Sequence, residues 1–224
     1  MKTSTLSSIL AGVFLAPILT LSAAAVAPGV NRIANPGFEL GDTNWSSFVP
    51  GESKDKGCTF TISAVNPHSG KACGELKSAE YARYSAGPRT VDGGPILAGQ
   101  RCRLTFWIRA DTQTLTRSAP GFLVRMILWG EDGKQLPGDE AIFVGVNGQV
   151  TTQSMAQRMD LSAYSELLPV KWTKVEVVLE VPDNLGPCKL GRPEFFAHYT
   201  LGSVFIDDIS LERVPATVPL TGAK

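Results

Sequence analysis

The sequence predicts an all-β protein, a β-sandwich or jelly roll, from two observations. Short runs of alternating apolar and polar residues recur along the chain, and clusters of Gly, Pro, Asn and Asp separate them. No window shows the sustained period of an amphipathic helix. Regularly spaced strands without intervening helices are typical of two packed antiparallel sheets.

The expected strands follow from the alternating runs in chain order. They are residues 59–65, 103–110, 122–129, 171–181, 195–201 and 203–214. Residues 160–168 (DLSAYSELL) predict one helical turn, with Asp160 or Ser162 as its N-cap. The long insert at 130–160 is expected to be either a loop over a sheet face or an extra hairpin.

The alternation also assigns side chains to the two faces of a strand. In 103–110 and 122–129 one set is apolar throughout, which predicts that it faces the core. The other sets contain indoles and guanidiniums, and large apolar groups left in water usually mark a contact surface. We expect the following side chains to share the outer face of one sheet: Trp107, Arg109, Arg125 and Trp129.

Composition limits the classes of function. The 224 residues include 21 basic and 21 acidic side chains, so the formal net charge is zero. Nucleic-acid binding draws on surplus Lys and Arg, and so does attraction to an anionic membrane surface. Neither partner is therefore expected. We expect one domain over residues 28–214, followed by a disordered Pro/Thr-rich tail over 215–224.

The N-terminus reads as a signal peptide over residues 1–27. Lys2 precedes an apolar stretch from Ile9 to Leu21, and Ala25 and Ala27 fit the small-residue cleavage rule. The alternative is a membrane anchor, but this stretch is shorter than the ~20 residues that span a bilayer. We expect a secreted, periplasmic or cell-surface protein whose mature chain is not inserted in a membrane.

The four cysteines are Cys58, Cys73, Cys102 and Cys188. Export would place them in an oxidising compartment, where disulfides form. No C-x-x-C pair supports zinc or redox chemistry. We expect two disulfides, with Cys58–Cys73 and Cys102–Cys188 as the favoured pairing among three. The alternative is four buried free thiols.

Four segments resemble one family in their order along the chain. They are NPGFELGDTNW (35–45), HSGKACGEL (68–76), LTFWIRAD (104–111) and SVFIDDISLERV (203–214). This order resembles carbohydrate-binding modules of families 4, 9, 16 and 22, which are galactose-binding-domain-like jelly rolls. The resemblance covers residues 31–214. Relatives of this fold also serve as structural or protein-binding domains.

The resemblance implies a structural calcium ion between the opening strand, the H-S-G turn and the closing strand. Calcium prefers carboxylate and carbonyl oxygens. Glu39 and Asp207 match the carboxylate positions, with backbone oxygens near Gly37, Ser69 and Lys71; Asp208 is the less favoured carboxylate. The alternative is that Glu39 and Asp207 only form salt bridges or cap turns.

A sugar site needs aromatic rings for C–H faces and planar polar groups for hydroxyls. The expected outer face supplies both types. The resemblance adds Tyr81 and Tyr84 as stacking aromatics and His198 as a polar contact. Alternatively, Trp45 and Trp172 belong to the core, while Arg109 and Arg125 are solvated or pair with Glu176 and Glu180.

The resulting interpretation is a secreted, non-catalytic module that binds a polysaccharide or oligosaccharide. The two arginines of the expected face hint at an acidic glycan. A structural or adhesion domain of the cell envelope is the first alternative. A jelly-roll lyase or glycosidase using Tyr81, Arg109, Arg125 and His198 is the second, although no G-x-S-x-G, H-E-x-x-H or Walker-type motif is present.

Overall fold

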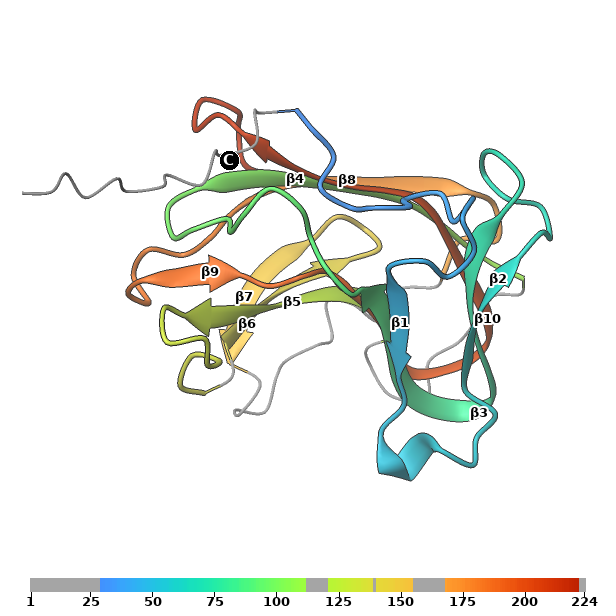
Figure 1. Cartoon of the computed structure of the whole chain (residues 1–224). Coiled ribbons are helices and arrows are strands. Elements are labelled where there is room, and N and C mark those ends of the chain that lie inside the picture. The colour runs from blue at the N-terminus through green and yellow to red at the C-terminus, as the bar shows by residue number, and fades with distance from the viewer. Residues whose placement is uncertain (1–28, 112–120, 139, 155–167, 222–224) are drawn as a thin grey trace, which may run out of the picture.

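The computed structural model describes residues 29–111, 121–138, 140–154 and 168–221 (Figure 1). The predicted signal peptide and nearly all of the predicted helical turn at 160–168 lie outside these residues. Within the described part of the chain, no helix has the length and apolar character needed to cross a bilayer. The elements are β1 (Trp45–Phe48), the 3-10 turn η1 (Gly51–Ser53), β2 (Thr59–Ser63), β3 (Cys73–Pro88), β4 (Arg101–Ala110), β5 (Phe122–Gly130), β6 (Glu140–Gly145), β7 (Val150–Ser154), β8 (Thr173–Glu180), β9 (Cys188–Leu190) and β10 (Glu194–Val214).

Two long strands, β3 and β10, divide the antiparallel strands between two layers. The first part of β10 pairs with β5, and its later part pairs with β4. We call the layer of β4, β8 and β2 the β4 sheet, and the layer of β5, β6, β7 and β1 the β5 sheet. In Figure 1, β4 and β8 lie in one layer and β5, β6 and β7 in the other.

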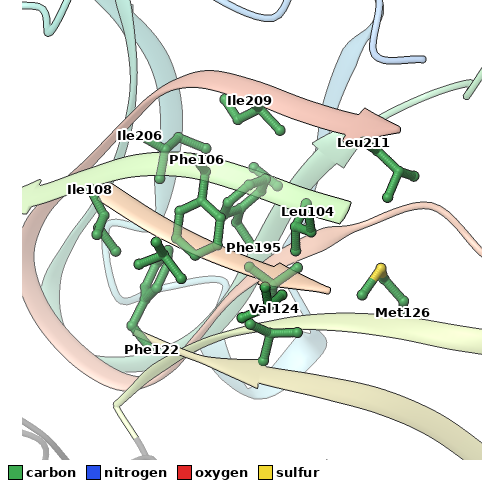
Figure 2. Packing of buried hydrophobic residues seen from close by; sticks show 14 of the residues in the cluster. Leu104, Phe106, Ile108, Phe122, Val124, Met126, Phe195, Ile206, Ile209 and Leu211 are labelled. Atoms are coloured by element: carbon green, nitrogen blue, oxygen red, sulfur yellow. The ribbon is translucent and has the colours of Figure 1, made fainter. Parts of the chain in front are cut away.

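The core lies between these layers, as Figure 2 shows. Leu104, Phe106 and Ile108 of β4 are fully buried, as are Val124 and Met126 of β5. The ring of Phe106 meets that of Phe195 edge to face at a centroid distance of 5.3 Å. The all-β sandwich and the inward-facing sets of both strands are therefore confirmed, and Trp45 is a core residue.

The closing strand differs from the sequence prediction, which has two strands at 195–201 and 203–214. The structure has the single strand β10, with register shifts between His198 and Gly202. Tyr199 and Gly202 both have positive φ, at 58° and 89°. These irregularities bend one strand so that it serves both sheets, as β-bulges do. The insert holds the β6–β7 hairpin, one of the two expected alternatives.

The C-terminal segment is not a disordered tail over its described residues. Thr221 exchanges backbone and side-chain hydrogen bonds with Val178 of β8. Arg101 donates from Nη1 to the carbonyl oxygens of Ala216 and Val218. Because these contacts tie residues 215–221 to β4 and β8, the prediction of disorder is wrong for them.

The expected disulfides are absent from the structure, since all four cysteines are free thiols. Cys73, Cys102 and Cys188 are buried, and Cys58 is half-buried. Cys73 and Cys58 each hydrogen-bond a backbone carbonyl, of Ser63 and Ser53 respectively. Burial raises the pKa of the Cys73 and Cys102 thiols to about 12. The structure therefore agrees with the free-thiol alternative for all four cysteines, although Cys58 is not fully buried.

Candidate functional site

The four outer residues expected on one face lie on opposite sides of the sandwich. Trp107 and Arg109 face outward from the β4 sheet, while Arg125 and Trp129 face outward from the β5 sheet. The prediction of a shared face is therefore wrong. The alternation within each strand is correct, but pairing along β10 places β4 and β5 in different layers.

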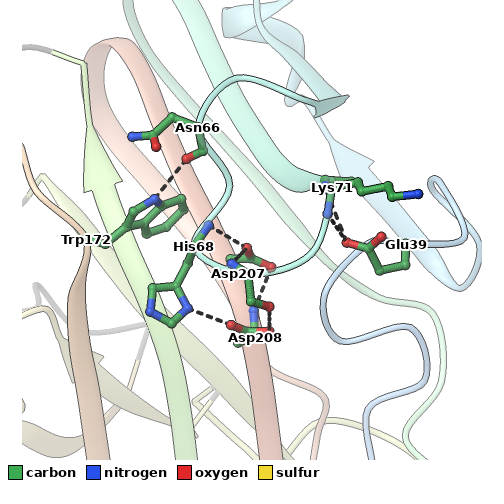
Figure 3. Close-up of polar contacts among 9 residues, drawn as sticks. Glu39, Asn66, His68, Lys71, Trp172, Asp207 and Asp208 are labelled. Carbon is green, nitrogen blue, oxygen red and sulfur yellow. Dashed lines mark hydrogen bonds and ion pairs between the residues drawn. The ribbon is translucent and has the colours of Figure 1, made fainter.

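Trp107 is covered by the H-S-G turn. The imidazole of His68 stacks on its indole at a centroid distance of 3.7 Å and an interplanar angle of 17°. Trp172 meets the same imidazole edge to face and donates its indole N–H to the Asn66 carbonyl at 2.9 Å (Figure 3). Trp172 is thus a half-buried residue of this outer face and not a core residue. Stacking by His68 leaves the Trp107 ring poorly placed to receive a sugar.

Arg109 is also enclosed, with only 5% of its surface exposed. Its guanidinium lies 3.8 Å from the centroid of Phe205 and 5.1 Å from that of Trp172. It donates to the Val65 carbonyl at 2.6 Å and pairs with Asp111 at 3.0 Å. These cation–π and polar contacts give Arg109 a structural role in holding the loop over the β4 sheet.

The carboxylates considered as partners of Arg109 and Arg125 pair with other arginines. Glu176 and Glu180 approach Arg103 and Arg101, at 3.8 and 2.6 Å, and Arg125 pairs with Glu194. The reason is that β8 lies beside β4, so its carboxylates face the outer residues of that strand.

Tyr84 cannot stack on a ligand because it is fully buried in the core. Burial raises the pKa of its phenol. Tyr81 is half-buried, and its carbonyl accepts a hydrogen bond from Lys56 Nζ at 3.1 Å. His198 lies on the β5 sheet, where its ring stacks on Phe196 at 5.7 Å. Arg125 approaches the same phenylalanine at 4.9 Å, so His198 and Arg125 share a face.

Trp129 lies beside a hollow of about 440 Å³ at the edge of the β5 sheet. The wall is formed by the segment after β3, by the end of β5, by β9 and the segment that joins it to β10, and by Arg32 and Leu211. Gly191 lets this last segment pass close to the indole, since a side chain there would lie 2.9 Å from Trp129 Nε1. We call this feature the Trp129 hollow; the polar side chains in its wall are Arg32, Arg89, Thr90, Lys189, Arg192 and Glu194.

Sequence reasoning identified Trp129 but missed these polar residues. They belong to connecting segments, to the short strand β9 and, for Glu194, to the first position of β10, where alternation gives no assignment of faces. The one local signal was the GRPE run at 191–194, in which cationic and acidic side chains flank a turn residue.

The five residues predicted to surround calcium do lie together. Glu39 Oε1 accepts backbone N–H bonds from Lys71 at 2.8 Å and Ala72 at 3.2 Å. Asp207 Oδ2 accepts from His68 and Ser69, and its Oδ1 accepts from Asp208 (Figure 3). Two carboxylates from distant parts of the chain therefore hold one turn, residues 68–72, which we call the H-S-G turn.

The surroundings of this turn are rich in oxygen. Gly37 lies against both aspartates, since a side chain there would approach Asp208 Oδ1 to 3.4 Å and Asp207 Oδ1 to 3.7 Å. Asp208 accepts from Ser69 Oγ at 2.8 Å and lies 2.6 Å from His68 Nδ1. Burial raises the pKa of Asp207 to about 6, against the opposing effect of its backbone N–H bonds.

These residues fit a calcium ion by chemistry, because hard oxygen donors are what calcium prefers. No group of three or more His, Cys, Asp or Glu is placed to hold a metal within the described ranges. A cation here would therefore use Asp207, Glu39 and backbone carbonyls together. The backbone N–H groups of Ser69 and Lys71 donate to Asp207 and Glu39 and so help to hold the turn.

Comparison with known proteins defines the fold. No protein-family model matches the chain, and no curated protein matches it. Among solved structures, it is similar to the enzymatically active domain of tailspike protein 4 of bacteriophage CBA120, with a TM-score of 0.50 and 14% identity. The match covers 84% of this chain, which spans only 22% of that one.

Two carbohydrate-binding modules are similar over nearly their whole length. One is the family 16 module 2, with a TM-score of 0.43, 16% identity and coverage of 81% of this chain and 99% of that one. The other is the C-terminal family 22 module of Clostridium thermocellum Xyn10B, with a TM-score of 0.46, 11% identity and coverage of 86% and 96%. The fold itself follows from the strand pairing described above, which makes the chain a β-sandwich jelly roll.

Proposed function

We propose that this protein is an exported, non-catalytic module that binds a carbohydrate in the Trp129 hollow. The observation that carries the proposal is the combination of a half-buried indole with hydrogen-bonding side chains around one concave space. A sugar ring presents an apolar C–H face and a rim of hydroxyls, so it needs both kinds of contact. Concave sites with a few fixed polar groups are the usual form of small-ligand sites.

The arrangement of charged residues favours binding over catalysis. The residues considered for an enzyme do not assemble, because Arg109 lies on the β4 sheet while Arg125 and His198 lie on the β5 sheet. Glu194, the carboxylate in the wall of the hollow, is paired with Arg125 at 2.5 Å. A general acid or base must reach the scissile bond with an oxygen that is free to give or take a proton. The ion pair with Arg125 leaves Glu194 poorly suited to that role.

Affinity electrophoresis in gels that contain soluble polysaccharides tests the proposal, with Trp129→Ala compared with Trp107→Ala. Loss of the Trp129 platform should weaken retention about tenfold or more. Trp107→Ala should leave retention unchanged, because His68 already covers that ring. Thermal unfolding of both variants establishes that each is folded.

The opposite pattern, with retention lost only in Trp107→Ala, would place the site on the β4 sheet. Retention on no polysaccharide would favour the alternative of a structural or adhesion domain. Release of new reducing ends or unsaturated uronates from a polysaccharide would show an enzyme instead.

We further propose that calcium binds between Asp207 and Glu39 as a structural ion. Support comes from the carboxylate of Asp207, which is fully buried. Among the described residues, the hydrogen bonds that it accepts come from backbone N–H groups and not from a basic side chain. A divalent cation would lower the cost of burying that charge.

A further inference from the structure

The wall of the Trp129 hollow has an excess of positive charge. Its ionisable side chains comprise four cations and a single carboxylate, namely Arg32, Arg89, Lys189, Arg192 and Glu194. Glu194 already has a cationic partner, since its Oε2 accepts hydrogen bonds from Nε and Nη2 of Arg125 at 3.1 and 2.5 Å. Arg192 approaches Glu194 Oε1 only to 3.9 Å. The chain as a whole is neutral, so this local excess is a property of the hollow.

The arginines of this wall are held by neutral groups. Arg89 donates from Nε to the Trp45 carbonyl at 2.9 Å, and Arg192 donates from Nη1 to the Arg89 carbonyl at 3.3 Å. Arg32 donates from Nε to the Asp92 carbonyl at 2.7 Å and from Nη2 to the Gly94 carbonyl. A carbonyl oxygen orients a guanidinium but does not neutralise its positive charge.

Arg32 is the most deeply buried of these cations. It is only 1% exposed, and its Nη1 is buried without a hydrogen-bond partner among the described residues. Its pKa is lowered, first by burial and then by the nearby Arg213. Positive charge in a region of low dielectric acts more strongly on a neighbouring anion than the same charge in water.

We infer that the Trp129 hollow selects a negatively charged sugar, through a carboxylate or sulfate substituent placed against these cations. The inference rests on the proposed function, because it names the class of carbohydrate that the same site takes. Arg192 and Lys189 lie at the accessible rim, where each can donate to an anionic oxygen. Arg32 acts through its field rather than by contact.

The test compares charged and neutral forms of one glycan. The probes are oligogalacturonate and oligoglucuronate, each with its methyl-esterified form, and dextran sulfate with dextran. Titration calorimetry at pH 7 and low salt should show each acidic form binding at least tenfold more tightly than its neutral partner, since charge-assisted bonds are the strong ones. Preference among the acidic probes then distinguishes a carboxylate from a sulfate.

Arg192→Gln is the matched variant, because its side chain is exposed and its removal leaves the core intact. It should weaken binding of the acidic form about tenfold and that of the methyl ester by a clearly smaller factor, because glutamine keeps N–H donors for hydroxyls but loses the charge. Arg103→Gln is the control, since Arg103 carries the same charge on the outer face of the β4 sheet.

The outcomes separate the two proposals. Equal affinity for acidic and esterified forms, with both lost in Trp129→Ala, would overturn charge selection and leave carbohydrate binding intact. Equal weakening by Arg103→Gln and Arg192→Gln would also overturn it, because it would indicate non-specific attraction. Binding of none of the probes would overturn charge selection, while carbohydrate binding itself is decided by retention in the polysaccharide gels.

Discussion

At the scale of a single residue, Gly70 explains how the H-S-G turn can close over a carboxylate. Its φ is 58°, in the left-handed region where glycine pays no steric cost. A side chain at this position would lie 2.1 Å from Glu39 Oε1, the oxygen that accepts the N–H groups of Lys71 and Ala72. The glycine therefore permits both the backbone conformation and the close approach of Glu39.

Replacement of Gly70 by alanine should destabilise the protein in two ways. The left-handed conformation costs about 1–2 kcal/mol for a residue with a side chain, and displacement of Glu39 should bring the total to about 3 kcal/mol. Chemical denaturation measures the loss. Gly41→Ala is the control, because its φ is also positive, at 66°, but nothing lies within 4 Å of the added carbon. Equal losses in the two variants would show that Glu39 does not hold the turn.

At the scale of the element, β10 determines where every candidate residue lies. It is a strand of 21 residues with a bend near its middle, and each half pairs with a different neighbour. The same bend separates Trp107 from Trp129. The motif SVFIDDISLERV was identified from the sequence. That it continues the same strand as FFAHYTL was not, because Gly202 predicted a break between two strands.

The edge strand β8 depends on the C-terminal segment. Val178 donates its N–H to Thr221 Oγ1 at 2.7 Å and accepts the N–H of Thr221 at 2.9 Å. Unpaired groups on an edge strand invite association with another chain. The described part of the C-terminus therefore serves as a cover for this edge.

Thr221→Val should remove the acceptor of the Val178 N–H while keeping the shape of the side chain. The expected loss is about 1 kcal/mol in the free energy of unfolding, because a half-buried donor loses its partner. Thr173→Val is the control, since its hydroxyl bonds the exposed carbonyl of Lys171 and its loss should cost less than about 0.5 kcal/mol. Urea denaturation of both variants measures the difference, and identical midpoints would contradict the role of Thr221.

At the scale of the whole molecule, the two proposed functions use different residues. The H-S-G turn, Asp207 and Glu39 gather on the β4 sheet, whereas the Trp129 hollow lies at the edge of the β5 sheet. A cation at the first place would stabilise the fold without touching the second. Structural and binding roles can therefore be tested independently.

Removal of calcium should lower the thermal stability of the protein but not its intrinsic sugar affinity. At a hundredfold excess over the dissociation constant, a ligand adds about 2.7 kcal/mol, which raises Tm by about 5 °C or more in a chain of this size. Differential scanning calorimetry with calcium chloride and with a chelator measures this shift. Asp207→Asn should abolish it, and magnesium should not reproduce it. An unchanged Tm would mean that the backbone N–H bonds alone hold the turn.

The sequence by itself determined the all-β class and the inward-facing sets of β4 and β5, because strand alternation is a local property with a period of two residues. Through the resemblance of their motifs to a known family, it also predicted that Glu39 and Asp207 lie at the same turn. Only the tertiary structure decided which strands share a sheet, that the thiols are free and that the described C-terminus is docked. These depend on the pairing of β10 with both β4 and β5, a long-range choice that no short window of sequence contains.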